Sequence, residues 1–338
     1  MMTLLEDLPN ELLFDVFEYI SARDLYYSFW ALNRRINYIV RSLKNLSLII
    51  YKNEPLLIQT FADKIFRLQV SNHYDIIDID HFPNLRSLSL YNASDKQLQQ
   101  IRYDCMPNLM YLFIPIPNIT ESSAKLARNI FSNQLPSLRY ADLGIIDVNY
   151  ISLSSWSPSL RVLCINCTKS IVIRMVLLVC PNLKRFQVNL VKNNSKIATQ
   201  LPTKTLNHNL KTFILLVSCR SLPLEKINDI LLDIPNVTRI YLRWCCDTLF
   251  VALARMLSER LKYLSQFGCN IIEFPNDIEY NNIKSCREEK QSLKPFHISK
   301  DIDIEIYLGE ISSSNRKHCI VSTQRKSIRN QSHYSHNN

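Results

Sequence analysis

Apolar residues in the first part of the chain recur at helical spacing. Between residues 8 and 20 they form one stripe when successive residues are placed 100° apart: Leu12, Leu13, Val16, Phe17 and Ile20. The stripe predicts a helix with Asp7 as its cap and Pro9 in the first position, where a missing N–H costs nothing. Two shorter helices are expected, one after Ser21 or Asp24 and one over residues 33–40. Three short helices bury too little to be stable alone, so we expect this module to dock on the solenoid described below, on another chain, or on both.

A second pattern runs from residue 65 to residue 264. Each unit has two aliphatic or aromatic positions three residues apart and a third two residues further on, which predicts a strand with one buried face. Successive units are 22 to 29 residues apart, within the range of leucine-rich repeats. Helices are expected between the strands, at residues 96–105, 124–131, 171–179, 225–232 and 248–257. The units begin at Leu85, Leu109, Leu138, Leu160, Leu183, Leu210, Val237 and Leu261, with an earlier one at Ile65.

Repeated strand-plus-helix units predict an α/β fold. We expect an N-terminal three-helix module over residues 1–45 and a leucine-rich-repeat-like solenoid, with a parallel sheet on its concave side, over residues 46–311. A last strand is expected at residues 301–308 and a disordered basic tail at residues 312–338. The asparagine or cysteine that usually ends such a repeat is mostly missing, so an irregular solenoid is expected. A non-repeat α/β domain with parallel strands is the alternative.

Composition excludes several classes of enzyme. The chain has 3 glycines, too few for the Gly-rich loops of nucleotide-binding enzymes. Its net charge is +10, but half of it lies after residue 311, which argues only weakly for nucleic acid binding. The pair Cys164 and Cys167 has no matching second pair and falls on opposite faces of a strand, so no metal, cofactor or catalytic residue is predicted.

No segment predicts a membrane span or an export signal. The longest apolar stretch, residues 171–180, is far shorter than the roughly 20 residues needed to cross a bilayer. The start is acidic and lacks the basic and apolar regions of a signal peptide. We therefore expect a cytoplasmic or nuclear location with reduced thiols.

The first helices carry a recognisable set of residues. They are Leu8-Pro9, Glu11, Leu12-Leu13, Phe17, Tyr19-Ile20, Asp24-Leu25, Phe29 and Asn33-Arg34-Arg35. This set resembles the F-box family between residues 5 and 43. The sequence departs from the family at Ala31-Leu32, where Val-Cys is frequent, and at Ile36, where Trp is frequent. An ordinary helical cap on the solenoid is the alternative.

The resemblance implies a substrate adaptor with no chemistry of its own. An F-box would dock on the Skp-type linker subunit of an SCF ubiquitin ligase, and through it on a cullin, while the solenoid would hold a protein substrate that the sequence does not identify. Contacts to the linker are then expected from Leu8, Pro9, Leu12, Leu13 and Phe17, and from Ile20, Leu25 and Phe29, which either touch the linker or hold the helices together.

The strand residues between the buried aliphatics suit substrate binding. Tyrosine and arginine recur there, and these residue types dominate binding hot spots. A partner with acidic or phosphorylated elements is indicated. The alternatives are a repeat scaffold unconnected with ubiquitin, and an enzyme or nucleic-acid-binding protein. The predicted substrate residues are Arg67, Tyr91, Tyr111, Phe113, Tyr140, Arg185, Gln187, Arg239, Tyr241, Arg243 and Tyr263.

Overall fold

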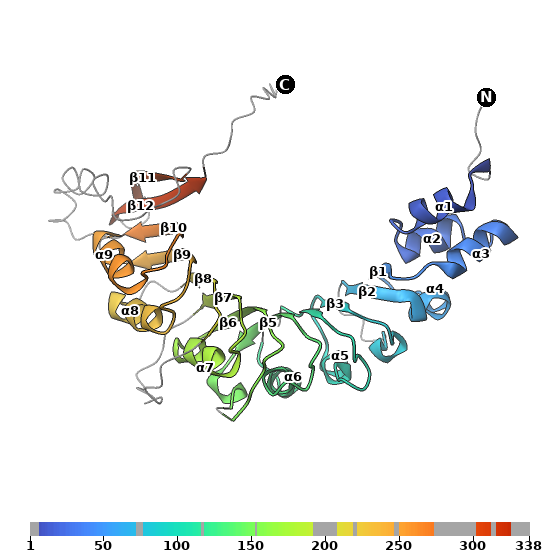
Figure 1. The fold of residues 1–338 in the computed structure, drawn as a ribbon, viewed down its shortest axis with the longest axis horizontal. Coiled ribbons are helices and arrows are strands. Elements are labelled where there is room, and N and C mark those ends of the chain that lie inside the picture. The colour runs from blue at the N-terminus through green and yellow to red at the C-terminus, as the bar shows by residue number, and fades with distance from the viewer. Residues whose placement is uncertain are drawn as a thin grey trace, which may run out of the picture. The chain divides into compact units, whose positions relative to one another are not determined.

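The structure is a computed structural model (Figure 1). It describes residues 7–71, 77–115, 118–152, 154–191, 208–218, 222–246, 250–273, 302–311 and 316–325. The chain divides into two compact units: Met1–Phe186 with Leu206–Asn209, and Gln187–Thr205 with Leu210–Asn338. The helical module therefore shares a unit with the first strands, and the expected border at residue 45 does not separate the two units.

Three helices open the first unit: α1 (Asn10–Phe17), α2 (Ala22–Ser28) and α3 (Arg34–Ser42). The Ser21 hydroxyl caps α2 by accepting a hydrogen bond from the Asp24 amide at 3.2 Å, and the Asn33 side chain caps α3. Helix α1 is shorter than predicted. Pro9 is its N-cap and not, as predicted, its first helical residue. Its last expected residues, 18–20, form a turn that leads to Ser21.

The strands of the first unit pair in parallel, in chain order. Strands β3 and β4 alternate buried and outward residues, whereas β5 and β6 each contain consecutive buried residues. Buried residues of neighbouring strands align into a row of five side chains with no exposed surface: Leu68, Leu88, Leu112, Ala141 and Leu163. This row is the core that the period-two pattern predicted. The strands are β1 (Leu46–Ile50), β2 (Ile65–Val70), β3 (Ser87–Leu90), β4 (Tyr111–Phe113), β5 (Tyr140–Ile146) and β6 (Val162–Cys167).

Helices cover one side of these strands. Figure 1 shows α5, α6 and α7 on the same side of the strands to which they connect. The opposite face is the one that the outward strand residues line. Helix α5 begins with a capping box between Ser94 and Gln97, as the sequence indicated, but it ends at Gln100 rather than at residue 105. The helices are α4 (Pro55–Phe61), α5 (Asp95–Gln100), α6 (Glu121–Phe131) and α7 (Ile171–Val179), with 3₁₀ turns at Ala62–Lys64, Ile79–His81 and Val148–Tyr150.

A repeated backbone contact, termed here a rung, fixes the register between successive repeats. In each rung one carbonyl accepts hydrogen bonds from two successive amides of the next repeat. The Arg86 carbonyl, for example, accepts from Met110 and Tyr111, both at 2.9 Å. Rungs keep the strands aligned although the connections between them differ in length. The rung carbonyls belong to Arg86, Met110, Arg139 and Arg161 in the first unit and to Lys211 and Thr238 in the second.

Side chains reinforce this alignment. After the proline of a repeat, an amide or hydroxyl donates to a carbonyl of the preceding repeat: Asn84 to Asp63 at 2.6 Å, Ser137 to Pro107 at 2.7 Å and Asn182 to Pro158 at 3.1 Å. These bonds tie loop backbone together. In regular leucine-rich repeats, the asparagine at the end of the repeat ties loop backbone together in this way. This chain mostly lacks that asparagine.

The second unit continues with parallel strands and ends in a hairpin. Trp244 on β9 is buried, and its indole N–H donates to the Leu222 carbonyl at 3.2 Å. Strand β10 pairs antiparallel with β12, which pairs antiparallel with β11. The elements are β7 (Arg185–Leu190), which starts at the border between the units, β8 (Thr212–Val217), α8 (Leu224–Leu232), β9 (Arg239–Cys246), α9 (Phe250–Arg260), β10 (Gln266–Glu273), β11 (Ile302–Ile311) and β12 (Arg316–Arg325).

The predicted α/β class, a helical module followed by parallel strands, is confirmed. The prediction of a disordered tail over residues 312–338 is wrong for residues 316–325, which form β12. Its run Cys319-Ile320-Val321 pairs with both neighbouring strands, which satisfies its backbone groups, although the surrounding composition is polar and basic. Residues 326–338 lie outside the described part. Strand β1 and helix α4 were not predicted at all.

Candidate partner-binding surfaces

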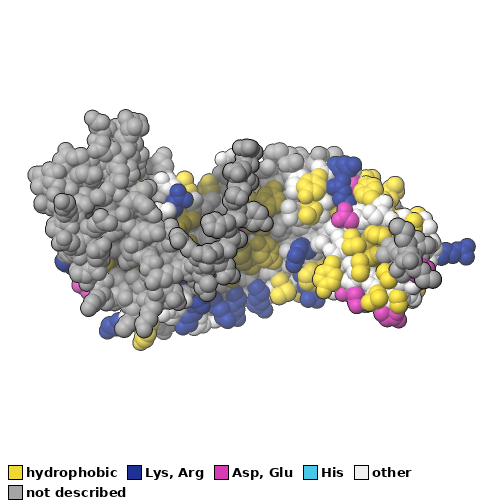
Figure 2. All heavy atoms as spheres, turned by 90° about the horizontal axis from the view of Figure 1, so that it is seen from above, with side chains coloured by type: hydrophobic (Ala, Val, Ile, Leu, Met, Phe, Trp, Pro, Cys, Tyr) yellow, Lys and Arg dark blue, Asp and Glu magenta, His cyan; other side chains and the backbone are white. Residues whose placement is uncertain are grey.

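Helix α1 presents two apolar faces. Leu13 and Phe17 have no exposed surface, and the Phe17 ring packs 4.7 Å from that of Phe29 inside the module. Leu12 and Val16, by contrast, are 48% and 47% exposed, and Tyr19 just beyond the helix is 91% exposed. Figure 2 shows hydrophobic and acidic side chains together on this N-terminal part, at the right of the view. An amphipathic helix with a second apolar stripe is typical of a partner interface.

The structure separates the predicted linker contacts into two groups. Leu13, Phe17 and Leu25 are buried in the module's own core. Leu8, Ile20 and Phe29 are half-buried, and Pro9 and Leu12 are exposed. The assignment of these residues to the linker stays a prediction, with the accessible ones now its stronger part.

Two residues of the exposed stripe were absent from the predicted contacts. Val16 lies four residues after Leu12, on the same side of the helix, and the exposed Tyr19 follows in the turn after it. The apolar arc in the sequence includes Val16, but its exposure is seen only in the structure.

A polar cluster ties the module to Glu54, the N-cap residue of helix α4. The Arg23 guanidinium lies 3.1 Å from the Glu54 carboxylate, and the Tyr27 hydroxyl donates to the same oxygen at 2.8 Å. This hydrogen bond is the main reason why the pKa of Tyr27 is raised. The other Glu54 oxygen is buried, with no hydrogen-bond partner in the described part of the chain. The Arg23 guanidinium also lies 5.6 Å from the ring centre of Tyr51.

The open face of the first unit contains a trough over β2, β3 and β4. The outward side chains of β3 are small, Ser87 and Ser89, whereas the neighbouring strands carry Arg67 on one side and Tyr111 and Phe113 on the other. The short side chains leave a pocket of about 490 Å³ between them. The trough is thus a direct result of which residues occupy the outward positions of one strand.

Aromatic rings build one wall of this trough. Tyr111 and Tyr140 stack with ring centres 4.1 Å apart and planes 10° apart. Tyr91, at the end of β3, packs against Phe113 at 5.2 Å. Stacked rings are rigid and lose little entropy on binding, which suits a recognition surface.

Tyr140, Asp142 and Cys164 lie further along the same face, on β5 and β6. The Tyr140 hydroxyl lies 3.9 Å from the Cys164 sulfur. Burial raises the pKa of Tyr140, of Asp142 and of the Cys164 thiol. A cysteine nucleophile needs the opposite shift. No group of three potential metal ligands occurs among the residues with described structure.

The predicted substrate residues lie mostly on outward strand positions. In the first unit Arg67, Tyr91 and Arg185 are exposed and Tyr111, Phe113 and Tyr140 are half-buried. In the second unit Gln187 is half-buried, and Arg239, Tyr241 and Arg243 form an exposed row on β9. Whether they bind a substrate stays a prediction.

Tyr263 does not lie on a strand, contrary to the prediction. It is 65% exposed in a turn, and β10 starts only at Gln266. Ser265 and Gln266 donate to the Thr238 carbonyl in the same way as Thr238 and Arg239 donate to the Lys211 carbonyl. Ser265 is therefore the equivalent of Thr238, and Leu264, not Leu261, is the equivalent of Val237. Helix α9 runs to Arg260, which moves the strand start downstream.

Among the described residues, no helix is long and apolar enough to cross a membrane.

Comparison with known proteins identifies the helical module. Residues 5–48 match the F-box domain. No curated protein matches the sequence. Among solved structures, a chain from the crystal structure of the yeast Rad7 and Elc1 complex is similar at 15% identity and a TM-score of 0.33, covering 76% of this chain and 86% of that one. The sequence-based recognition of an F-box is confirmed, and this chain carries an F-box domain at residues 5–48.

Proposed function

We propose that this chain is a substrate-recognition adaptor of an SCF-type ubiquitin ligase. F-box domains bind Skp1-type linkers. The observation that supports this role most directly is the exposed stripe of Leu12, Val16 and Tyr19 inside the matched region. Without a partner, these apolar side chains would remain in water at a cost.

The adaptor acts by position. The F-box holds the chain on the linker, and the open strand face holds a protein substrate, so that a substrate lysine meets activated ubiquitin at a high effective concentration. The linker interface is expected to bury on the order of 1,600 Å², with a few apolar anchors carrying most of the affinity. Leu12 and Val16 are the central anchors, because Leu13 and Phe17 are already used inside the module.

A pull-down with a purified Skp-type linker tests this role. The wild-type chain and Leu12→Asp plus Val16→Asp are compared, with Leu56→Asp as the matched control, since Leu56 is 66% exposed on α4 outside the F-box region. We expect the double variant to lose binding by a factor of about 100 or more, because two charges replace apolar anchors, while the control binds like wild type.

Circular dichroism shows whether each variant is folded. Equal linker binding by the folded double variant and the wild type would refute the predicted interface. No linker binding by the wild type would refute the adaptor role and leave a repeat scaffold with an unrelated partner.

A further inference from the structure

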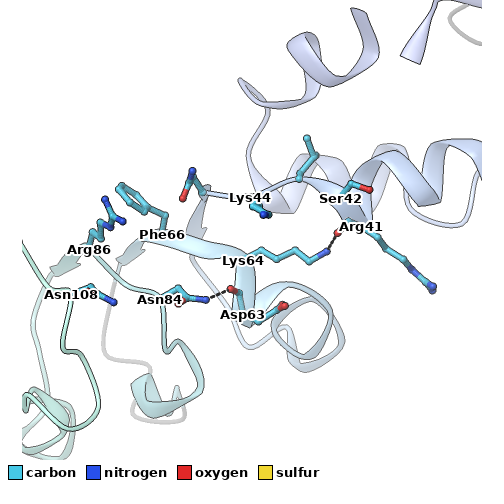
Figure 3. A pocket seen from close by; sticks show the side chains of 11 residues that line it. Arg41, Ser42, Lys44, Asp63, Lys64, Phe66, Asn84, Arg86 and Asn108 are labelled. Carbon is cyan, nitrogen blue, oxygen red and sulfur yellow. Dashed lines mark hydrogen bonds between the residues drawn. The ribbon is translucent and has the colours of Figure 1, made fainter. Parts of the chain in front are cut away.

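A second pocket, termed here the α3 pocket, lies beside the aromatic trough of the first unit. It has a volume of about 610 Å³, between the end of α3 and the starts of β2 and β3 (Figure 3). This volume falls in the range of small-ligand sites. Arg41 contributes to the rim, but its guanidinium is directed away from the pocket (Figure 3). The polar side chains directed otherwise are cations and amides, with one carboxylate: Lys44, Lys64, Arg86, Asn45, Asn84, Asn108 and Asp63.

The charge of this lining favours an anion with a small charge. Three cations, those of Lys44, Lys64 and Arg86, face the single carboxylate of Asp63, which leaves a net charge of +2. The Lys64 ammonium donates to the Arg41 carbonyl, near the last turn of α3, where a positive charge is favourable. That contact accounts for Lys64 but for neither Lys44 nor Arg86.

Arg86 is held in place on both sides of its strand. Its amide donates to the Phe66 carbonyl at 2.9 Å, and its carbonyl is a rung acceptor. Its guanidinium lies 5.0 Å from the ring centre of Phe66. A guanidinium presents its N–H groups as a planar fork, which matches the two oxygens of a carboxylate. Because the backbone is fixed and the side chain rests near a ring, little freedom is lost when Arg86 binds an anion.

The turn from α3 into β1 brings Lys44 to the same pocket. Helix α3 has Leu43 as its C-cap and β1 begins at Leu46, so the turn consists of Lys44 and Asn45. Asn45 has a φ of 59°, in the left-handed region that asparagine adopts more readily than most residues. The sequence of this turn therefore supplies the pocket with a cation and an amide.

The amides add a second kind of recognition. Asn45, Asn84 and Asn108 each carry an acceptor oxygen and an NH₂ group. The NH₂ of Asn84 donates to the Asp63 carbonyl at 2.6 Å (Figure 3). Amides accept hydrogen bonds from a ligand as well as donate them. A ligand that combines an anion with N–H groups thus matches this lining better than an anion such as sulfate, which only accepts.

The α3 pocket and the trough are continuous. Both are lined by Phe66 and Arg86, and on the trough side follow Arg67, the small Ser87, and Tyr111. The end of a polypeptide has the matching order of groups: a carboxylate with one negative charge, a backbone N–H beside it, and then further side chains. A chain end in the α3 pocket would place the preceding residues along the trough.

We propose that the α3 pocket binds the free C-terminal carboxylate of a protein substrate, with the residues that precede it in the trough. This inference rests on the proposed adaptor role and names the class of substrate. Arg86 and Lys44 bind the carboxylate, and the asparagines contact the last peptide groups. An aspartate or glutamate within a chain fits less well, because its chain continues on both sides and its backbone N–H lies further from the carboxylate. A nucleic acid is disfavoured because the trough supplies only one further cation, Arg67.

Degenerate peptide libraries test the proposal on the full-length chain. One library ends in a free carboxylate, the second has the same sequences with an amidated end, and the third is amidated with one fixed internal glutamate. We expect the free-carboxylate library to be retained at least about ten-fold better than either amidated one, since hydrogen bonds between ionised partners are the strong ones. Retained peptides should be enriched in aromatic or aliphatic residues just before the terminus.

The variant Lys44→Gln plus Arg86→Gln should lose the preference for a free terminus. Arg86→Lys should lose part of it, because lysine keeps the charge but not the planar fork. The matched control is Lys125→Gln, which removes an exposed lysine of α6 in the same unit and should behave like wild type. Circular dichroism shows whether each variant is folded.

Three results would overturn the proposal. The first is equal retention of the free and amidated libraries by the wild type, and the second is an unchanged preference in the double variant. The third is retention of the internal-glutamate library as strong as that of the free-carboxylate library, which would mean that the pocket recognises charge alone.

The same double variant separates the two proposals. It should still bind the linker, because α1 is untouched. A chain that binds free C-termini but no linker would refute the adaptor role alone, and the reverse result would refute only the role of the α3 pocket.

Discussion

Helix α1 and the open face of β2–β4 are both candidate interfaces, but they are built in opposite ways. The stripe on α1 is apolar and convex, with acidic neighbours such as Asp15 exposed on the same helix. The strand face is hollow, with short side chains between arginine and tyrosine. An apolar stripe gives affinity and little discrimination, whereas directional polar and aromatic groups discriminate between ligands. The difference suits one constant partner and one selected partner.

The largest expected effect separates the two faces of α1 itself. Phe17→Ala removes a fully buried ring and should lower the free energy of unfolding by about 3–5 kcal/mol. Leu12→Ala, on the exposed face, should cost less than about 0.5 kcal/mol yet weaken linker binding. Urea denaturation gives both stabilities. If Leu12→Ala destabilises the chain as much as Phe17→Ala, the exposed stripe belongs to the core and the comparison fails.

A middle effect concerns the cluster that joins the module to the strands. Glu54→Ala leaves the Arg23 guanidinium and the Tyr27 hydroxyl without their shared acceptor. We expect a loss of about 2 kcal/mol, less than for a fully buried pair because Arg23 is partly exposed. Glu54→Gln retains an acceptor for Tyr27 and should lose less. Equal denaturant midpoints for wild type and Glu54→Ala would show that the module is held by other contacts.

The smallest expected effect is a pH dependence on the strand face. Burial raises the pKa of Asp142 above the value of about 3.9 for a free carboxyl. At pH values between the pKa of the unfolded chain and the raised pKa of the folded chain, the folded chain binds more protons than the unfolded chain. The contribution of Asp142 to the free energy of unfolding therefore falls as pH rises. Asp142→Asn should therefore stabilise the chain at pH 7, by less than about 0.5 kcal/mol because the group is only half-buried, and give no gain near pH 4. Urea midpoints at both values check this; a gain of the same size at both would contradict the stated cause.

Much of the fold could be predicted because its signals are local. The period-two rows depend only on which residues alternate, and Leu68, Leu88 and Leu112 are buried as that pattern requires. The capping box at Ser94 could also be read directly from residue types. Element ends were less accurate, because pairing with a neighbouring strand decides them. Tyr263 is the clearest case, since the register against β9 moves the strand past it.

The binding surfaces were only partly predictable. Periodicity placed Tyr111 and Arg67 on the outward face, but it did not indicate that Ser87 between them leaves a trough. A pocket of about 610 Å³ lined by Lys44, Lys64 and Arg86 was missed altogether, because these residues are separated by about 20 residues each and meet only through the parallel pairing of β1, β2 and β3. The full apolar arc on α1 was recognised, but which half is buried depends on α2 and α3.

The rung contacts have a consequence for how such a chain can change. Successive rung carbonyls in the first unit are 24, 29 and 22 residues apart, at Arg86, Met110, Arg139 and Arg161, yet the strands they join begin in the same register, which shifts only after Asp142 in β5. Added or deleted residues in the connections therefore leave the outward positions aligned, and the entropic cost of a longer connection grows only slowly. Insertions and point substitutions thus act on separate parts of the molecule, so ligand preference can be altered one strand at a time without rebuilding the scaffold.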